Sequence, residues 1–251
     1  MNPEIVFYIV VFLYGIVIGS FLNVCIYRIP KKENIVKTHS HCMACGEKLR
    51  WYDLIPLVSY LFLGGKCRKC KSKISAQYPI IEAANGLLYV LVFAVKGFQP
   101  VSIIYCLFVS ALLTLSVIDF RTYEIPLGIN IMILTLGLIH LAMDLSNWLQ
   151  YAIGLLSVSV FLLIIYYVTK GRGIGGGDVK LMAVCGLLLG WQCNLLGFLI
   201  GCILGSVIHL LRMKFSKADH VLAMGPYLAM GTFLAMLWGD QMISWYLSSM
   251  F

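Results

Sequence analysis

The sequence carries little charge. Only 12% of its 251 residues are Asp, Glu, Lys or Arg, and no more than 11 of them are acidic, whereas soluble proteins carry about 25% charged residues. Hydrophobic residues make up 61% of the chain, against about 45–50% in soluble proteins. This balance excludes an ordinary soluble protein and indicates one that lies within a membrane. It also leaves no compact basic domain, so we expect no nucleic-acid partner.

The apolar residues fall into blocks of the length that crosses a bilayer, for which about 20 helical residues are needed. The blocks lie at about 4–27, 79–95, 102–119, 127–144, 149–169, 179–193, 195–212 and 221–239. We therefore expect an all-α polytopic membrane protein with about eight transmembrane helices. The first block has no basic segment before it and no small-residue cleavage site after it, so it predicts a span rather than a cleaved signal.

The basic residues predict the orientation of these helices, because short cytoplasmic loops carry an excess of Lys and Arg. If the N-terminus lies outside, all of the 19 basic residues except Lys96 fall in inner loops or at the inner ends of spans. The opposite orientation reverses this distribution. We therefore expect both termini outside, and we interpret the net charge of +8 as a signal of topology.

One long polar segment, residues 28–78, separates the first two blocks and falls on the cytoplasmic side. It contains two Cys-x-x-Cys pairs, whose members are Cys42, Cys45, Cys67 and Cys70. Four cysteines at this spacing are typical of a structural zinc site, and a cytoplasmic location disfavours disulfides. A redox pair or unliganded thiols are the alternatives. His39 and His41 adjoin the first pair and could replace a ligand, but we expect them to be ordinary loop residues.

Two aspartates stand at the ends of apolar blocks. Asp119 ends the third block and Asp178 begins the sixth, directly after a run of glycines. The predicted topology brings both to the cytoplasmic face, where two carboxylates sharing one site can activate a water for hydrolysis. The alternatives are a helix N-cap for Asp178 and an interfacial pair with Arg121 for Asp119.

Other residues near the aspartates receive lesser roles. The absence of side chains at Gly175 and Gly177 lets a substrate backbone approach Asp178. Lys180 is expected to point away from Asp178 along the helix, as an interfacial anchor. Glu82, at the start of the second block, could bind a basic substrate segment or a methyl donor, or could simply extend to the interface.

Taken in order, several motifs resemble those of the type IV prepilin peptidase family. They are Gly19-Ser-Phe-Leu-Asn23, Tyr27-Arg28-Ile-Pro30, the two cysteine pairs around Asp53-Leu-Ile-Pro56, Tyr78-Pro79-Ile-Ile-Glu82, Ile118-Asp119, and Gly175-Gly-Gly177-Asp178-Val-Lys180. The resemblance runs from about residue 15 to the end of the chain. It departs at Leu127, where the family often has Asp or Asn, and before Gly225-Pro226, where Pro-Phe is common.

The resemblance implies a bifunctional enzyme of the bacterial inner membrane with its active site facing the cytoplasm. The catalytic pair of the Gly-x-Gly-Asp aspartyl proteases would be Asp119 and Asp178, acting on the basic leaders of prepilins and pseudopilins. The new N-terminus would then be methylated with S-adenosylmethionine. The implied division is residues 1–27 as the first helix, 28–78 as a zinc-binding, methyltransferase-associated module, and 79–251 as the peptidase core. Besides prepilins, we expect lipid as a partner and leave a homodimer open.

Other functions fit parts of the pattern. One alternative is a peptidase without an active methyltransferase, because no glycine-rich strand-turn-helix motif for S-adenosylmethionine is visible. Another is a zinc-stabilised membrane component of a secretion or pilus machine that catalyses nothing. A transporter that uses the two aspartates as a proton relay is a third, although the apolar blocks offer few other polar groups.

Overall fold

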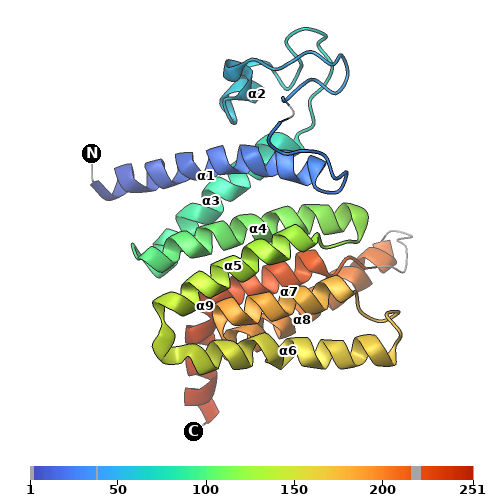
Figure 1. The fold of residues 1–251 in the computed structure, drawn as a ribbon. Coiled ribbons are helices and arrows are strands. Elements are labelled where there is room, and N and C mark those ends of the chain that lie inside the picture. Colours follow the sequence, from blue (N-terminus) through green and yellow to red (C-terminus); the bar gives the residue numbers. More distant parts are fainter. Residues whose placement is uncertain (1–2, 38, 216–221, 251) are drawn as a thin grey trace. The chain divides into compact units, whose positions relative to one another are not determined.

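A computed structural model of the chain describes residues 3–37, 39–215 and 222–250 (Figure 1). These residues form helices joined by loops, and the part that the structure describes contains two isolated β-bridges but no β-sheet. The predicted all-α class is confirmed. The chain divides into two compact units, Met1–Ser110 and Ala111–Phe251. This division does not test the predicted functional boundaries after residues 27 and 78.

The first unit is built on two long helices that lie side by side (Figure 1). Its elements are α1 (Pro3–Arg28), η1 (Trp51–Leu54), α2 (Val58–Phe62), α3 (Gln77–Lys96) and the first part of α4 (Pro100–Thr122). Glycine allows α1 and α3 to approach closely, because a Cβ at Gly15 would lie 2.6 Å from the Cα of Gly86. The Asn85 side chain donates a hydrogen bond to the Gly15 carbonyl at 2.7 Å and fixes this contact.

The second unit packs its helices around a short central one. Its elements are the rest of α4, α5 (Leu127–Met143), η2 (Leu145–Asn147), α6 (Trp148–Val168), α7 (Gly176–Leu189), α8 (Trp191–Phe215) and α9 (Gly225–Met250). Helix α7 contacts α5, α6, α8 and α9. The side chains of Leu181, Met182 and Leu188 are fully buried there. The apolar sequence of α7 therefore serves helix packing on several sides.

Glycines set the length and the packing of α7. It ends before Gly190, whose φ of +80° favours glycine, and α8 begins at the next residue. Gly186 faces Gly154 of α6 at backbone contact, so a Cβ at either position would collide with the carbonyl group of the other. This small-residue contact is typical of membrane helices.

Each of the eight predicted blocks contains a helix. Residue 221, the first residue of the last block, lies outside the described residues. Five helical segments are long and apolar enough to cross a membrane: Pro3–Arg28, Gln77–Lys96, Pro100–Thr122, Leu145–Val168 and Trp191–Phe215. Helix α5 is apolar but shorter. A multi-pass membrane protein is thus confirmed, while the count of eight spans stays a prediction.

Candidate active site and metal centre

The two predicted aspartates line one cavity of about 300 Å³ in the second unit. Asp119 lies near the end of α4, and Asp178 lies in the first turn of α7. The cavity is also lined by Tyr123, Glu124, Ile125, Leu127, Asn130, Gly175, Gly176, Gly177 and Lys180. Segments separated by about sixty residues in the sequence thus bring two carboxylates to one space, and their catalytic role is taken up below as a proposal.

Asp119 is held by the start of another helix. Its side chain is buried, and its Oδ2 accepts a hydrogen bond of 2.9 Å from the backbone N–H of Gly225, where α9 begins. A Cβ at Gly225 would lie 2.7 Å from the same oxygen, so only glycine lets the backbone approach the carboxylate this closely. Sequence reasoning missed this contact, and the one available signal was a Gly-Pro pair at the start of an apolar block.

The glycines before Asp178 keep its surroundings open. A Cβ at Gly175 would lie 3.1 Å from Asp178 Oδ2, and one at Gly177 would lie 3.0 Å from the Cβ of Ile125. Gly175 occupies the N-cap of α7, and Asp178 is the third helical residue. The alternative of Asp178 as the N-cap is therefore wrong, although a carboxylate in the first turn still faces the positive end of the helix dipole.

Four more polar side chains line the cavity, those of Tyr123, Glu124, Asn130 and Lys180. Lys180 and Glu124 are exposed residues of this lining, and the expectation that Lys180 points away from Asp178 stays a prediction. Asn130 of α5 also lines the cavity and is 3% exposed. Sequence reasoning missed Asn130, because a single asparagine one turn into an apolar helix is common and does not by itself indicate a site.

The four predicted cysteines form one cluster in the first unit. The Sγ atoms of Cys42, Cys45, Cys67 and Cys70 all lie within 4.8 Å of one another, and those of Cys42 and Cys70 are 3.8 Å apart. Sulfurs at about 2.3 Å from a tetrahedral zinc lie about 3.8 Å from one another. The donor set and its spacing therefore fit a zinc ion, and they do not fit a hard cation that prefers oxygen.

The two halves of the cluster share one backbone geometry. The N–H of Cys42 donates to the Glu47 carbonyl at 2.8 Å, and that of Cys67 donates to the Ser72 carbonyl at 2.9 Å. Hydrogen bonds from the backbone N–H groups of Cys45 and Ala44 lower the pKa of the Cys42 thiol to about 6. Such N–H donors stabilise thiolate, which is the form that binds a metal.

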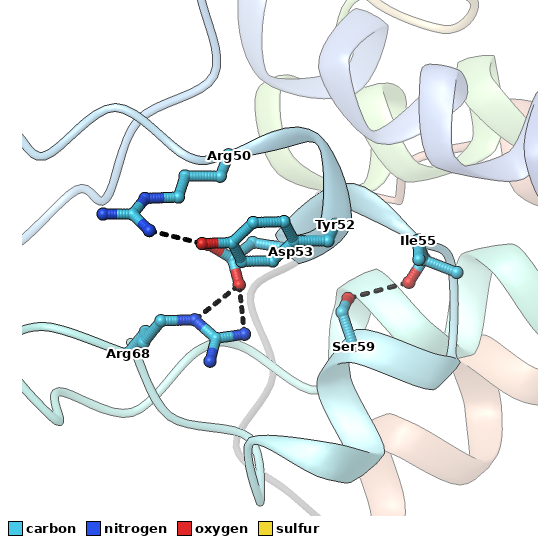
Figure 2. A network of polar contacts seen from close by, with 6 residues as sticks. All are labelled: Arg50, Tyr52, Asp53, Ile55, Ser59 and Arg68. Atoms are coloured by element: carbon cyan, nitrogen blue, oxygen red, sulfur yellow. Dashed lines mark hydrogen bonds and ion pairs between the residues drawn. The ribbon is translucent and has the colours of Figure 1, made fainter.

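A polar network ties the short helices of this loop to the second cysteine pair (Figure 2). Arg68, which lies between Cys67 and Cys70, donates from Nε and Nη2 to one oxygen of Asp53 at 2.9 and 2.7 Å. Its guanidinium also lies 5.0 Å from the centre of the Tyr52 ring. We define residues 40–74 as the cysteine module, since these contacts and the four thiols hold them together.

Glu82 of α3 is turned toward the cysteine module. Its side chain is buried, and its Oε2 accepts the backbone N–H of Leu57 at 2.8 Å. Leu57 has a φ of +59°, an uncommon backbone conformation for a residue with a side chain. The carboxylate thus accepts a hydrogen bond from the protein's own backbone, a partner that sequence reasoning did not consider. A role of Glu82 in binding substrate or methyl donor stays a prediction.

A second cavity, of about 330 Å³, lies in the first unit and is lined by Pro3, Glu4, Phe7, Tyr8, Phe93, Gly97 and Phe98. Its aromatic rings could stack on the adenine of S-adenosylmethionine. However, it adjoins the N-terminal end of α1 and the C-terminal end of α3, whereas the cysteine module connects the opposite ends. The predicted topology puts the cysteine module on the cytoplasmic side, so we do not propose this cavity as the site of the methyl donor.

Two family models match the chain. The bacterial peptidase A24 N-terminal domain matches residues 13–95, and the type IV leader peptidase family matches residues 106–210. The first of these ranges includes all four clustered cysteines, and the second includes both aspartates.

Curated proteins named prepilin leader peptidase/N-methyltransferase are similar to this chain over nearly its whole length. The protein of Pseudomonas aeruginosa is 35% identical over 98% of this chain and 95% of its own length. That of Stutzerimonas stutzeri is 34% identical over the same shares, and that of Bacillus subtilis is 33% identical over 95% of this chain and 97% of its own length. No solved structure matches the chain.

Proposed function

This chain belongs to the type IV leader peptidase family, and we propose that Asp119 and Asp178 are the pair with which it cleaves leaders from type IV prepilins and pseudopilins. The observation that carries the proposal is the single cavity that both carboxylates line, at the junction of α4, α7 and α9. We further propose that the protein methylates the new N-terminus with S-adenosylmethionine, since its relatives bear both names.

The two carboxylates divide the acid and base work of hydrolysis between them. A hydrogen bond from a backbone N–H is strongest to an ionised acceptor, so Asp119, which accepts the N–H of Gly225, is assigned as the base. It removes a proton from the attacking water, while protonated Asp178 donates to the carbonyl oxygen of the scissile peptide. In the second step the C–N bond of the gem-diol breaks, Asp119 passes its proton to the leaving amine, and Asp178 takes back a proton from a hydroxyl of the gem-diol.

The cysteine module takes a structural metal in this proposal. Cys42, Cys45, Cys67 and Cys70 would hold a zinc ion, which would supply a folding core to a segment that buries little of its own. We propose a division of the chain into three parts. Residues 1–27 form the first helix, residues 28–78 serve the methyltransferase activity, and residues 79–251 form the peptidase core.

We propose that the protein spans the bacterial inner membrane eight times, with the aspartate cavity and the cysteine module facing the cytoplasm. The distribution of Lys and Arg supports this orientation, since only Lys96 would lie outside. Exposed apolar side chains along α1, such as Leu13 and Val17, would contact lipid. The basic leader of a prepilin, on the same side of the membrane, would then reach the cavity.

The test of the peptidase proposal is cleavage of a model prepilin by the purified full chain in liposomes, read as a mobility shift on a gel. Asn keeps the size of Asp but cannot exchange the proton, so we expect Asp119→Asn and Asp178→Asn to lose cleavage by a factor of about 10³ or more. Asp240→Asn, an acid of α9 outside the cavity lining, should cut as wild type does.

Cleavage by both aspartate variants would overturn the assignment of the dyad, and failure of the wild type to cut would overturn the peptidase function. The methyltransferase proposal has a separate readout. Transfer of a labelled methyl group from S-adenosylmethionine to the cleaved product is expected with the wild type. A product that stays unlabelled would leave a peptidase without this second activity.

A further inference from the structure

The cavity that holds the two aspartates contains a buried amide without a partner. Asn130 of α5 is 3% exposed, and neither its Nδ2 nor its Oδ1 has a hydrogen-bond partner among the residues that the structure describes. Buried polar groups are nearly always hydrogen-bonded in native proteins, and each exception needs an explanation. An amide whose donor and acceptor are both unused is a strong exception.

Two other buried asparagines differ from Asn130 in this respect. Asn85 is fully buried in the first unit, where its Nδ2 donates to Gly15 and its Oδ1 accepts the Ser110 hydroxyl at 2.9 Å. Asn194 leaves only its Oδ1 unused, because its Nδ2 donates to two carbonyls at 3.2 and 3.1 Å. The Thr232 hydroxyl is also unused, but Thr232 does not line the aspartate cavity.

Asn130, Asp119 and Asp178 line the same cavity. We propose that the side-chain amide of Asn130 binds the backbone of the substrate beside the scissile peptide bond. This inference rests on the proposed peptidase function. It makes Asn130 a substrate-binding residue of the same reaction, separate from the aspartate pair that carries the protons.

The chemistry of an asparagine suits this partner. Its side chain offers an N–H donor and a carbonyl acceptor on one plane, and a peptide backbone presents the complementary carbonyl and N–H. Apart from the carboxylates, the lining side chains that can form hydrogen bonds are Tyr123, Lys180 and Asn130, and the first two are exposed to solvent. Only Asn130 is buried and neutral, so it can bind a peptide group without holding a competing charge near the aspartates.

An unpaired amide in the free protein is explained if its hydrogen bonds form only when the substrate binds. A bond formed only when the substrate arrives stabilises the bound state without stabilising the empty one, so it contributes to binding or to catalysis. The corresponding cost falls on the folded protein, because the amide is desolvated before it has a partner. Removing this amide should therefore have opposite effects on stability and on activity.

The first experiment compares wild type, Asn130→Leu and Thr232→Val as purified full chains, measuring kcat/KM for a model prepilin and the melting temperature. Leu is similar in size to Asn and needs no hydrogen bonds, so we expect an unchanged or higher melting temperature and a fall in kcat/KM of about tenfold or more. Thr232→Val removes an unused hydroxyl outside the cavity, and we expect the same sign of stability change with unchanged kcat/KM.

An unchanged kcat/KM in Asn130→Leu would overturn the inference. A fall in melting temperature would overturn it as well, because it would mean that the amide already has a partner in the free protein. If the wild type does not cut, the peptidase proposal fails and takes this inference with it. If the wild type cuts and Asp119→Asn does not, the peptidase proposal stands whatever Asn130→Leu does.

A second measurement separates substrate binding from an effect on the aspartates. Synthetic substrates in which each backbone N–H near the scissile bond is replaced in turn by an ester oxygen remove one donor at a time. We expect one replacement to lower kcat/KM of the wild type about tenfold and to cost nothing further in Asn130→Leu, since the bond is already lost. If every replacement costs the same in both proteins, Asn130 does not bind the backbone.

Discussion

The cysteine module and the surroundings of α7 are held together in different ways. In the module, residues 40–74, only Gly65 and Cys67 are buried, whereas eight of the fourteen residues of α7 are. Large apolar side chains of the module, including Trp51 and Phe62, lie 78% and 87% exposed. The module therefore has almost no hydrophobic core, and the proposed zinc ion at its four thiols would take the place of one.

Around α7 the opposite holds, and glycines with close backbone contacts replace polar networks. The contact of Gly154 with Gly186 and that of Gly225 with Asp119 leave little room for movement, because packed interiors yield only slightly. On the proposed function, the chemistry of hydrolysis would lie in the closely packed part of the chain, and the module would depend on a bound zinc ion. Each of the following changes tests one side of this contrast.

Removing the metal should have the largest effect. A four-cysteine zinc site contributes about 10–16 kcal/mol of apparent binding free energy, which the module cannot replace by burial. We expect a strong chelator to make residues 40–74 of the full chain sensitive to trypsin, which cuts after their many Lys and Arg residues, while α5 to α9 stay intact. The measurement is limited proteolysis with mass spectrometry of the fragments.

Single substitutions provide the control for this experiment. Cys70→Ser should give the same fragments without a chelator, and Cys202→Ser, a cysteine of α8 outside the cluster, should not. A module that resists trypsin after elemental analysis shows that the metal is gone would contradict the prediction. In that case the polar network of Figure 2 would hold the module by itself.

Gly225→Ala should have the next largest effect, on activity rather than on folding. The added methyl group would lie 2.7 Å from Asp119 Oδ2, so the carboxylate or the start of α9 must move. A displacement of about 1 Å at a reacting group can lower the rate about 100-fold, and we expect a loss of kcat of that size. Gly128→Ala is the matched control, since nothing lies within 4 Å of its added Cβ; equal activity in the two variants would refute the steric argument.

The sequence predicted most of what depends on local pattern. Long apolar blocks are helices wherever they occur, and two Cys-x-x-Cys pairs of equal spacing fold into matching turns, so these features follow from neighbouring residues. The shared face of Asp119 and Asp178 was also predictable, because the distribution of Lys and Arg assigns both residues to one side of the membrane.

What the sequence could not supply is the packing between helices that are distant along the chain. The hydrogen bond from Gly225 to Asp119 joins residues 106 positions apart, and no periodicity within either helix indicates it. The side of α5 on which Asn130 lies, and the place of Lys180 in the lining of the cavity, depend on the rotation of each helix about its axis. With apolar residues on several sides, a buried membrane helix carries little information on that rotation.

Asp53→Asn should have the smallest effect. It tests how much the ion pair between Asp53 and Arg68 contributes to the stability of the cysteine module. The change keeps the shape of Asp53, whose side chain is 7% exposed, but weakens its bonds to Arg68, whose side chain is 53% exposed. Because the Arg68 end of the pair stays in water, we expect the pair to contribute far less than a four-cysteine metal site. With metal bound, we expect the rate of tryptic cleavage in residues 40–74 to rise at most about fivefold, and peptidase activity to stay unchanged. If instead trypsin cut the module as fast as it does after chelation, the ion pair would contribute as much as the metal to the stability of the module. The four thiols alone would then not account for the fold of a segment that buries so little.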